Sequence, residues 1–246
     1  GPFGAALRAG APLEPRAMSR PFLWVDAFAE AAFAGNPCAV VFAANRVPED
    51  ARIAFTAETR LSETAFVVSS AVADFGARFY TAAGPIAMAG HPTLATVAAL
   101  LDRGMVSLDG GRADFTLEVG AGVLPITAKA RPGRPPLISM TQPAPVFGRR
   151  WDRAAIAALV ALEADDLAAD PRTVSTGTPF CATPLASLDA LRRATLDVAA
   201  LEAFREAEAA DFREPFLFAR RGFTAGGDTA ARLLLAPPEP PEDPFT

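Results

Sequence analysis

Four polar side chains stand where turns meet the expected strands and helices. Glu63 leads from a turn into an apolar strand, and His91, the single histidine, opens a helix. Asn36 follows a glycine in a turn, and Asp243 precedes a proline near the end of the sequence. A carboxylate can act as a general acid or base, and an imidazole can donate a hydrogen bond or carry a proton. The backbone amides at the helix start, where Gly90 precedes His91, can bind an anion.

Each of these residues also has a simpler structural explanation. Taken alone, Glu63 fits a solvated surface carboxylate, and His91 fits a capping or packing histidine. Asn36 is a common turn residue, and Asp243 fits a plain helix cap. Spacing by itself therefore favours structural roles, and any functional interpretation has to come from the set as a whole.

The composition excludes several classes of protein. The chain has 246 residues, of which 51% are hydrophobic and 21% charged, so it can bury a sizeable core and is not a disordered protein. Its net charge of -5 argues against a nucleic-acid partner, and no apolar run is long enough to span a bilayer. We therefore expect a cytoplasmic protein that binds neither nucleic acid nor membrane.

The sequence offers little material for a metal or disulfide site. The two cysteines, Cys38 and Cys181, cannot form a disulfide framework or a four-ligand zinc site, and only one histidine is present. Both cysteines stand in apolar runs, so we expect buried, inert thiols. We predict no metal and no cofactor.

Hydrophobic patterning predicts a mixture of strands and helices in two similar halves. In the first half, residues 90–104 predict a helix that is apolar nearly all round, with a proline in its first turn and Gly104 at its end. Further helices are expected at 48–58, 152–164 and 197–210, and strands at 22–28, 38–42, 65–69, 75–80, 123–130, 137–140, 215–219 and 230–236. Residues 173–181 are expected to join a strand to a turn and a new strand. By analogy, the second half also needs a central helix, and no remaining stretch supplies one.

These patterns predict three regions. Residues 1–17 show no strand or helix period and are expected to form a disordered extension. An N-terminal domain is expected at 18–122, ending near Gly120-Ala121-Gly122, and a C-terminal domain at 123–246. The Asp-Pro step at Asp243 is typical of a helix start, so we expect the second domain to be incomplete at that point.

Six motifs, taken together and in order, resemble the phenazine-biosynthesis isomerase family (PhzF-like proteins). The resemblance runs from about Pro21 to Thr246 and rests on six segments, which are Val25–Phe28, Phe33–Val41, Leu61–Val67, Ala89–Thr96, Val174–Phe180 and Glu242–Thr246. It implies an α+β fold like that of diaminopimelate epimerase, in which two similar domains each curl a mixed sheet around a central helix. The implied active site lies in the cleft between the domains, and the implied assembly is a homodimer.

The resemblance also assigns roles to individual residues. Glu63 matches the catalytic acid/base, His91 the active-site histidine, and Asp243 the aspartate of the Glu-Asp-Pro motif. Gly90 and Asn36 match positions that line the substrate cleft. The family continues beyond this motif with Gly, Ser or Asn, and Ala, followed by the second central helix. The chain as given stops at Thr246, so we expect a C-terminally truncated member of the family.

The implied activity is a cofactor-independent isomerisation of a small carboxylate-bearing substrate, by default a dihydro-hydroxyanthranilate-like acid. One carboxylate removes a proton from carbon and returns it at another carbon, and burial in a partly dry cleft would make Glu63 a stronger base. Two alternatives remain open. One is an amino-acid racemase or epimerase of the same fold, which should lose activity when its cysteines are blocked. The other is an inactive fragment or a non-catalytic binding protein.

Overall fold

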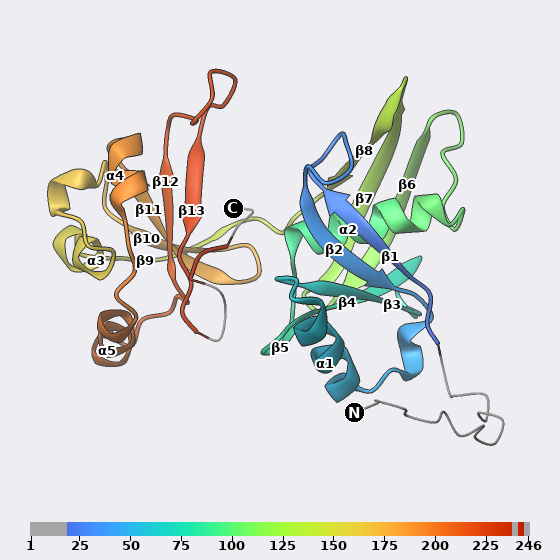
Figure 1. Ribbon diagram of the computed structural model, residues 1–246, viewed down its shortest axis with the longest axis horizontal. Coiled ribbons are helices and arrows are strands. Elements are labelled where there is room, and N and C mark those ends of the chain that lie inside the picture. The colour runs from blue at the N-terminus through green and yellow to red at the C-terminus, as the bar shows by residue number, and fades with distance from the viewer. Residues whose placement is uncertain (1–18, 238–240, 244–246) are drawn as a thin grey trace, which may run out of the picture.

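The structure is a computed structural model that describes residues 19–237 and 241–243, and it has two lobes side by side (Figure 1). The first lobe is a curled sheet with the strand order β1-β2-β3-β4-β6-β7-β8, with β5 paired to β4. The strands are β1 Phe22–Ala27, β2 Asn36–Val41, β3 Thr64–Val68, β4 Phe75–Thr81, β5 Gly84–Ile86, β6 Arg112–Val119, β7 Gly122–Arg131 and β8 Arg134–Met140. Helices η1 Ala44–Arg46, α1 Glu49–Thr59 and α2 Gly90–Asp102 complete this lobe.

Helix α2 lies inside the curl of the first sheet, as the apolar pattern predicts (Figure 1). Its side chains are buried on most sides, and Val97 and Leu100 are fully buried among residues from β2, β3, β4, β6 and β7. Such a helix is stable only when other elements cover it all round, which the curled sheet does. The packing therefore fixes where the first residues of α2 point.

Helix α1 covers the opposite face of the same sheet. Phe66 and Tyr80 pack there, and the buried Arg52 of α1 lies over both rings, at 5.4 and 5.5 Å from their centroids. This second layer explains why β4 is buried on both faces. Ala77 and Phe79 lie toward α2 and Tyr80 lies toward α1, because alternate side chains of a strand point to opposite faces of the sheet.

The second lobe is a five-stranded sheet with the order β13-β12-β11-β10-β9. Its strands are β9 Val146–Arg150, β10 Arg172–Ser175, β11 Pro179–Leu185, β12 Pro215–Ala219 and β13 Ala230–Leu233. Its helices are α3 Arg153–Leu159, η2 Ala164–Asp166, α4 Leu188–Arg193 and α5 Val198–Glu208. Three of them begin with a side-chain cap, since Asp152, Ser187 and Asp197 each accept a backbone N–H of the first turn.

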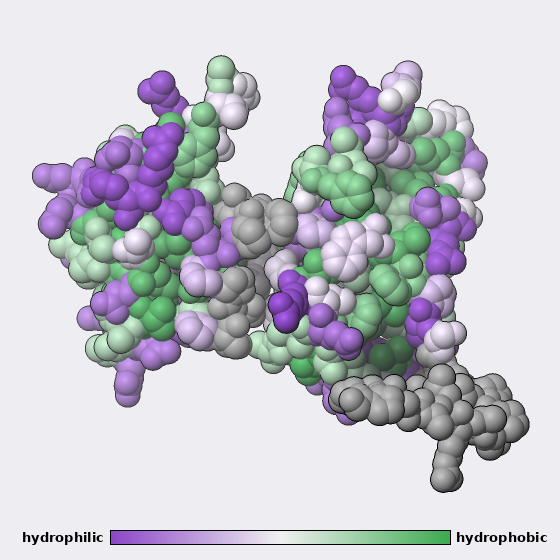
Figure 2. Space-filling view, viewed as in Figure 1, coloured by the Kyte–Doolittle hydropathy of each residue, from purple (hydrophilic) through white to green (hydrophobic). Residues whose placement is uncertain are grey.

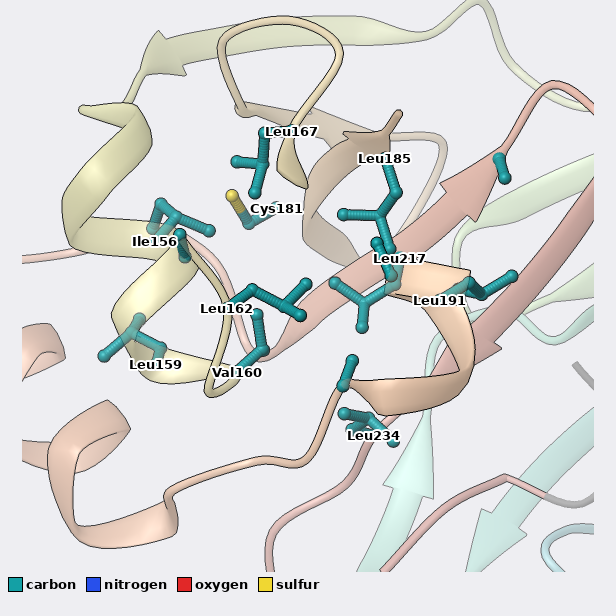
Figure 3. Close-up of a cluster of buried hydrophobic side chains, with 14 of the residues drawn as sticks. Ile156, Leu159, Val160, Leu162, Leu167, Cys181, Leu185, Leu191, Leu217 and Leu234 are labelled. Carbon is teal, nitrogen blue, oxygen red and sulfur yellow. The ribbon is translucent and has the colours of Figure 1, made fainter. Parts of the chain in front are cut away.

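The core of the second lobe lies on one face of its sheet, where α3, α4 and α5 pack (Figure 3). Fully buried Ile156, Leu191 and Leu201 from these helices meet Cys181 and Leu217 from the strands. The opposite face of the sheet carries half-buried side chains such as Phe180 and Phe216, which lie toward the first lobe. In the described ranges, all three α-helices of this lobe therefore lie on the outer side of the sheet.

The expected boundary after residue 122 is wrong for the sheets, because β7 and β8 continue the first sheet to Met140. The glycines there form a tight β6–β7 hairpin rather than a linker. A Cβ on Gly120 would lie 2.9 Å from the Cα of Ala87, and Gly122 has a φ of 125°. Close approach and a left-handed backbone therefore explain both glycines.

Other differences from the sequence expectations are local. The helix expected at 152–164 ends at Leu159, and Ala161 has a left-handed φ of 55°. The short helix α4 and the strands β5, β6 and β9 were not anticipated. The expected extension at 1–17 lies outside the described residues, as does the chain that follows Asp243. Within the described ranges, no helix is both long and apolar enough to cross a membrane.

Candidate active site

A cleft of about 590 Å³ lies between the two lobes. Glu63, His91 and Gly90 line it from the first lobe, while Asp243 and Arg213 line it from the second. Figure 2 shows the same two lobes in a space-filling view. The two lobes approach closely beside the cleft, where a Cβ on Gly177 would lie 3.3 Å from the Cβ of Met88. The chemistry-bearing residues from distant parts of the chain thus share one site.

Glu63 and His91 form the centre of the site. Glu63 immediately precedes β3, and His91 is the second residue of α2. Glu63 Oε2 lies 3.6 Å from His91 Nε2, and the side chains are 24% and 8% exposed. This separation is longer than a hydrogen bond but leaves the two groups within reach of one small substrate. The carboxylate is thus partly shielded from water, beside an imidazole that is almost wholly buried.

The environment of His91 keeps its imidazole neutral near pH 7. Burial lowers the pKa of His91 to about 4, and the negative charge of Asp243 opposes this only in part. His91 and Glu63 are therefore not an ion pair at neutral pH. His91 Nε2 is buried and has no hydrogen-bond partner among the described residues. A neutral imidazole in this state can donate or accept a single hydrogen bond to a bound molecule.

Gly90 lines the cleft as the first residue of α2. The cap position before it is Ala89, so no side chain accepts the backbone N–H groups of the first turn. A Cβ on Gly90 would meet only the Cε of Met140, at 3.9 Å. Space alone therefore does not require glycine, and the useful property of this position is that no side chain caps the start of the helix.

Asn36 does not line the cleft, unlike the other four residues singled out in the sequence. It is the first residue of β2 and only 7% exposed. Strand alternation places its side chain on the same face as Cys38 and Val40, which pack toward α2. Its Oδ1 has no hydrogen-bond partner among the described residues. Asn36 is therefore a buried residue of β2 and is not among the described lining residues of the cleft.

The two thiols are buried and do not line the cleft, as the sequence predicted for inert cysteines. Burial raises the pKa of Cys38 far above its usual range, and the charge of Glu63 raises it further. Burial likewise raises the pKa of Cys181 to about 12. Neither thiol is available as a thiolate at neutral pH. This geometry speaks against the thiol-dependent racemase alternative.

The sequence analysis missed several residues of the cleft. Phe180 and Phe216, with ring centroids 6.4 Å apart, form an apolar wall on the second lobe. Their strand alternation could have placed them on the face opposite the core. Arg213 is the cationic side chain among the described lining residues, and its backbone N–H donates to Pro179 O. No sequence signal marks Arg213, because it lies in a short connection between α5 and β12.

A second cavity of about 680 Å³ lies in the first lobe, between β1, α2 and β8. Three of its polar lining residues make loop contacts, since Asp26 accepts the N–H of Phe33 and Glu30 pairs with Arg131. In the described part of the chain, no three side chains of His, Cys, Asp and Glu gather as metal ligands would. The inter-lobe cleft is thus where proton-transfer groups meet.

Comparisons with known proteins show what the chain is similar to. Residues 25–232 match the family model described as phenazine biosynthesis-like protein (PhzC-PhzF). The chain is 30% identical over 175 residues to the uncharacterized isomerase YfhB of Bacillus subtilis, a match that covers 70% of this chain and 58% of YfhB. The crystal structure of a PhzF-family phenazine biosynthesis protein from Bacillus anthracis superposes with a TM-score of 0.77 at 26% identity, covering 93% of this chain and 77% of that one.

The fold is shared more widely than the sequence. A probable proline racemase from Agrobacterium radiobacter superposes with a TM-score of 0.59 at 14% identity, covering 89% of this chain and 71% of that chain. At this identity the likeness concerns the fold alone. It confirms the expected α+β fold of curled half-barrel sheets, which is shared with racemases and epimerases.

Proposed function

Because the chain belongs to the phenazine biosynthesis-like (PhzC-PhzF) family, we propose that it is a cofactor-independent isomerase that moves a proton within a small carboxylate-bearing substrate. One observation supports this most strongly. In the inter-lobe cleft, a partly shielded carboxylate lies 3.6 Å from a neutral, almost wholly buried imidazole. Such a pair suits proton transfer to and from carbon at neutral pH.

In the proposed reaction, Glu63 removes a proton from a carbon atom next to the unsaturated system of the substrate. The electron pair left on that carbon shifts into the conjugated system, and the protonated Glu63 returns the proton at another carbon. The overall change is a shift of one hydrogen and one double bond, with Glu63 restored as a carboxylate. His91 donates a hydrogen bond to the substrate or relays the proton, and Asp243 completes the polar lining of the cleft.

The substrate must bring its own negative charge into a cleft that already holds two carboxylates. We propose that its carboxylate binds at the backbone amides that start at Gly90, where no side chain caps the helix. Arg213, whose Nε lies 3.7 Å from the buried carboxylate of Glu214, supplies a positive charge on the opposite wall. The rings of Phe180 and Phe216 suit an apolar ring, so a dihydro-hydroxyanthranilate-like acid is the default substrate. We propose the cytoplasm as its location and a homodimer as its assembly, both on the family resemblance.

Replacement of Glu63 tests this assignment. With a dihydro-hydroxyanthranilate in D₂O, we expect wild-type protein to incorporate deuterium into the product, detected by NMR or mass spectrometry. Glu63→Gln keeps the size of the side chain but removes the base, so turnover should fall at least about 100-fold. Glu58→Gln, on the exposed surface of α1, is the matched control and should retain full activity. Equal turnover in Glu63→Gln and wild type would reject the proposal, as would no turnover in the wild type.

The racemase alternative gains no specific support. A thiol mechanism would need reactive cysteines in the cleft, and Cys38 and Cys181 are both fully buried elsewhere. The same D₂O assay with proline or other amino acids would detect exchange at the α-carbon. Exchange with amino acids, but not with the dihydro-hydroxyanthranilate, would favour that alternative.

A further inference from the structure

An arginine of the second lobe is fixed to the segment that carries Asp243. Arg232, in β13, donates from Nε and Nη2 to the two carboxylate oxygens of Glu242, at 2.7 and 2.6 Å. The arginine side chain is 20% exposed and the glutamate side chain 40% exposed. A guanidinium that makes two parallel bonds to one carboxylate fixes orientation as well as distance. Glu242 is the immediate neighbour of Asp243, which lines the cleft. The two bonds from Arg232 therefore fix the residue that precedes Asp243.

The same guanidinium is held from its other side. Arg232 Nη1 donates to the carbonyl oxygens of Leu191 and Ala194 at the end of α4, at 2.6 and 3.0 Å. These carbonyls are the acceptors that the end of a helix leaves without intrahelical partners. Arg232 therefore connects the packed body of the second lobe to Glu242. Its position depends on α4 and β13, which belong to the core side of the lobe, rather than on the cleft.

Backbone pairing extends this connection to Asp243 itself. The N–H of Asp243 donates to Leu233 O at 2.9 Å, and the N–H of Leu235 donates to Pro241 O at 3.0 Å. The segment 241–243 thus lies alongside the end of β13. Because Arg232 holds Glu242 within this short pairing, the Asp243 side chain is directed into the cleft. Its charge is felt at His91, where it opposes the effect of burial on the pKa.

We propose that Arg232 is a positioning residue that acts through Glu242 to hold the Asp243 carboxylate beside His91. Arg232 is not among the described lining residues of the cleft, so it is not a catalytic residue. The catalytic meaning of this arrangement rests on the proposed function. The positioning itself does not, and it can be tested without a substrate.

The charged and titratable groups around His91 set the expected response. Glu63 lies 3.6 Å away in front of β3, and Asp243 faces it from the second lobe. Arg213 lines the same cleft, and Cys38 of β2 lies near Glu63 as a neutral thiol. A loss of Asp243 from its place should lower the pKa of His91. The loss of the positive charge of Arg232 would by itself raise the pKa of His91. Displacement of Asp243 and loss of this charge therefore shift the pKa of His91 in opposite directions.

His91 is a convenient reporter because it is the single histidine of the chain. We propose an NMR titration of its imidazole in untagged wild type, Asp243→Asn, Arg232→Gln and Arg232→Lys. Asp243→Asn gives the full effect of losing the carboxylate. Arg232→Gln should lower the pKa of His91 by at least half as much. Arg232→Lys keeps the charge but cannot form the two-bonded fork, so it should also lower this pKa.

Two controls separate positioning from general loss of structure. Arg193→Gln removes another arginine of the same lobe, paired with Asp166 and Asp189, and should leave the pKa of His91 unchanged. In the Asp243→Asn background, Arg232→Gln should cause no further decrease. An unchanged or raised pKa in both Arg232 variants would overturn the proposal. So would an Asp243→Asn variant that titrates like wild type. If Arg232→Gln does not fold, Arg232→Lys alone decides between these outcomes.

Discussion

At the scale of single residues, the site places an almost wholly buried imidazole beside a carboxylate that is partly exposed to solvent. His91 is 8% exposed, while Glu63 keeps a quarter of its side-chain surface open to solvent. Burial disfavours the imidazolium, so the histidine stays neutral although the charge of Asp243 favours its charged form. A neutral donor can support proton transfer without forming a salt bridge that would neutralise the base.

The buried histidine should make stability depend on pH. The pKa of His91 is about 4 in the folded protein and 6.5 when unfolded, so below pH 6.5 the unfolded state binds the extra proton first. Stability is thus complete above pH 6.5 and falls as the pH drops toward 4, by about 3 kcal/mol in total. Urea unfolding at pH 7 and pH 4.5 should show this loss in wild type. His91→Gln should show a smaller loss over the same interval, and an equal loss in both proteins would contradict the prediction.

The sequence indicates those site residues that are tied to a local signal. Glu63, His91 and Gly90 each stand at the start of a strand or helix, and the structure brings them together with Asp243. Arg213 and Arg232 lack such signals. Arg213 matters only because the fold places it in the cleft, and Arg232 only because it pairs with Glu242, ten residues later. Long-range pairing of this kind is decided by the tertiary fold, which no local pattern encodes.

At the scale of elements, helix α2 is the element that positions Gly90 and His91 in the cleft. It is apolar nearly all round, and the curled sheet of the first lobe covers it. Its first turn holds Gly90 and His91, while its middle is fixed by fully buried side chains such as Leu100. A loss of packing in the middle of α2 should therefore destabilise the whole lobe.

Leu100→Ala should lower the free energy of unfolding by about 2–5 kcal/mol, because it removes buried methyl groups and leaves a cavity beneath the sheet. Leu137→Ala is the matched control, since this leucine of β8 is 49% exposed and its replacement should cost less than about 1 kcal/mol. Chemical denaturation monitored by circular dichroism measures both changes. Similar losses in the two variants would show that α2 is not packed as described.

Elements with strong periodicity or clear end signals were predicted well, including α2, α5 and most strands. The errors have physical causes. Helix α3 stops early because the chain turns through a left-handed residue at Ala161, which apolar spacing does not reveal. The glycines at 120 and 122 look like a linker, but a close approach to Ala87 and a tight hairpin require them. Turns and linkers share the same residue types, so composition alone cannot separate them.

At the scale of the whole molecule, the two lobes have separate hydrophobic cores. The first core surrounds α2, while the second lies on the outer side of its sheet, away from the cleft (Figures 1 and 3). Glu63 and His91 come from one lobe, and the apolar wall and Arg213 come from the other. Each lobe can therefore respond separately to changes in its own core.

We expect the two lobes to unfold in distinguishable steps. In a Trp24→Phe background, fluorescence of the buried Trp151 reports on the second lobe, and the NMR signal of His91 reports on the first. Leu217→Ala leaves a cavity in the core of the second lobe. The urea midpoint measured by Trp151 fluorescence should therefore fall more than the midpoint measured by the His91 NMR signal. Coincident midpoints that shift together would show that the lobes unfold as one unit.

The hairpin of β7 and β8 has a practical consequence. Lys129, the single lysine of the chain, is exposed on β7 and pairs in register with Leu137 of β8. Apart from the amino terminus, an amine-directed biotin reagent therefore has one target, which is not among the described residues of the cleft. Molecules tethered to a sensor chip through Lys129 are held by the first lobe, and small acids can then be screened for weak binding.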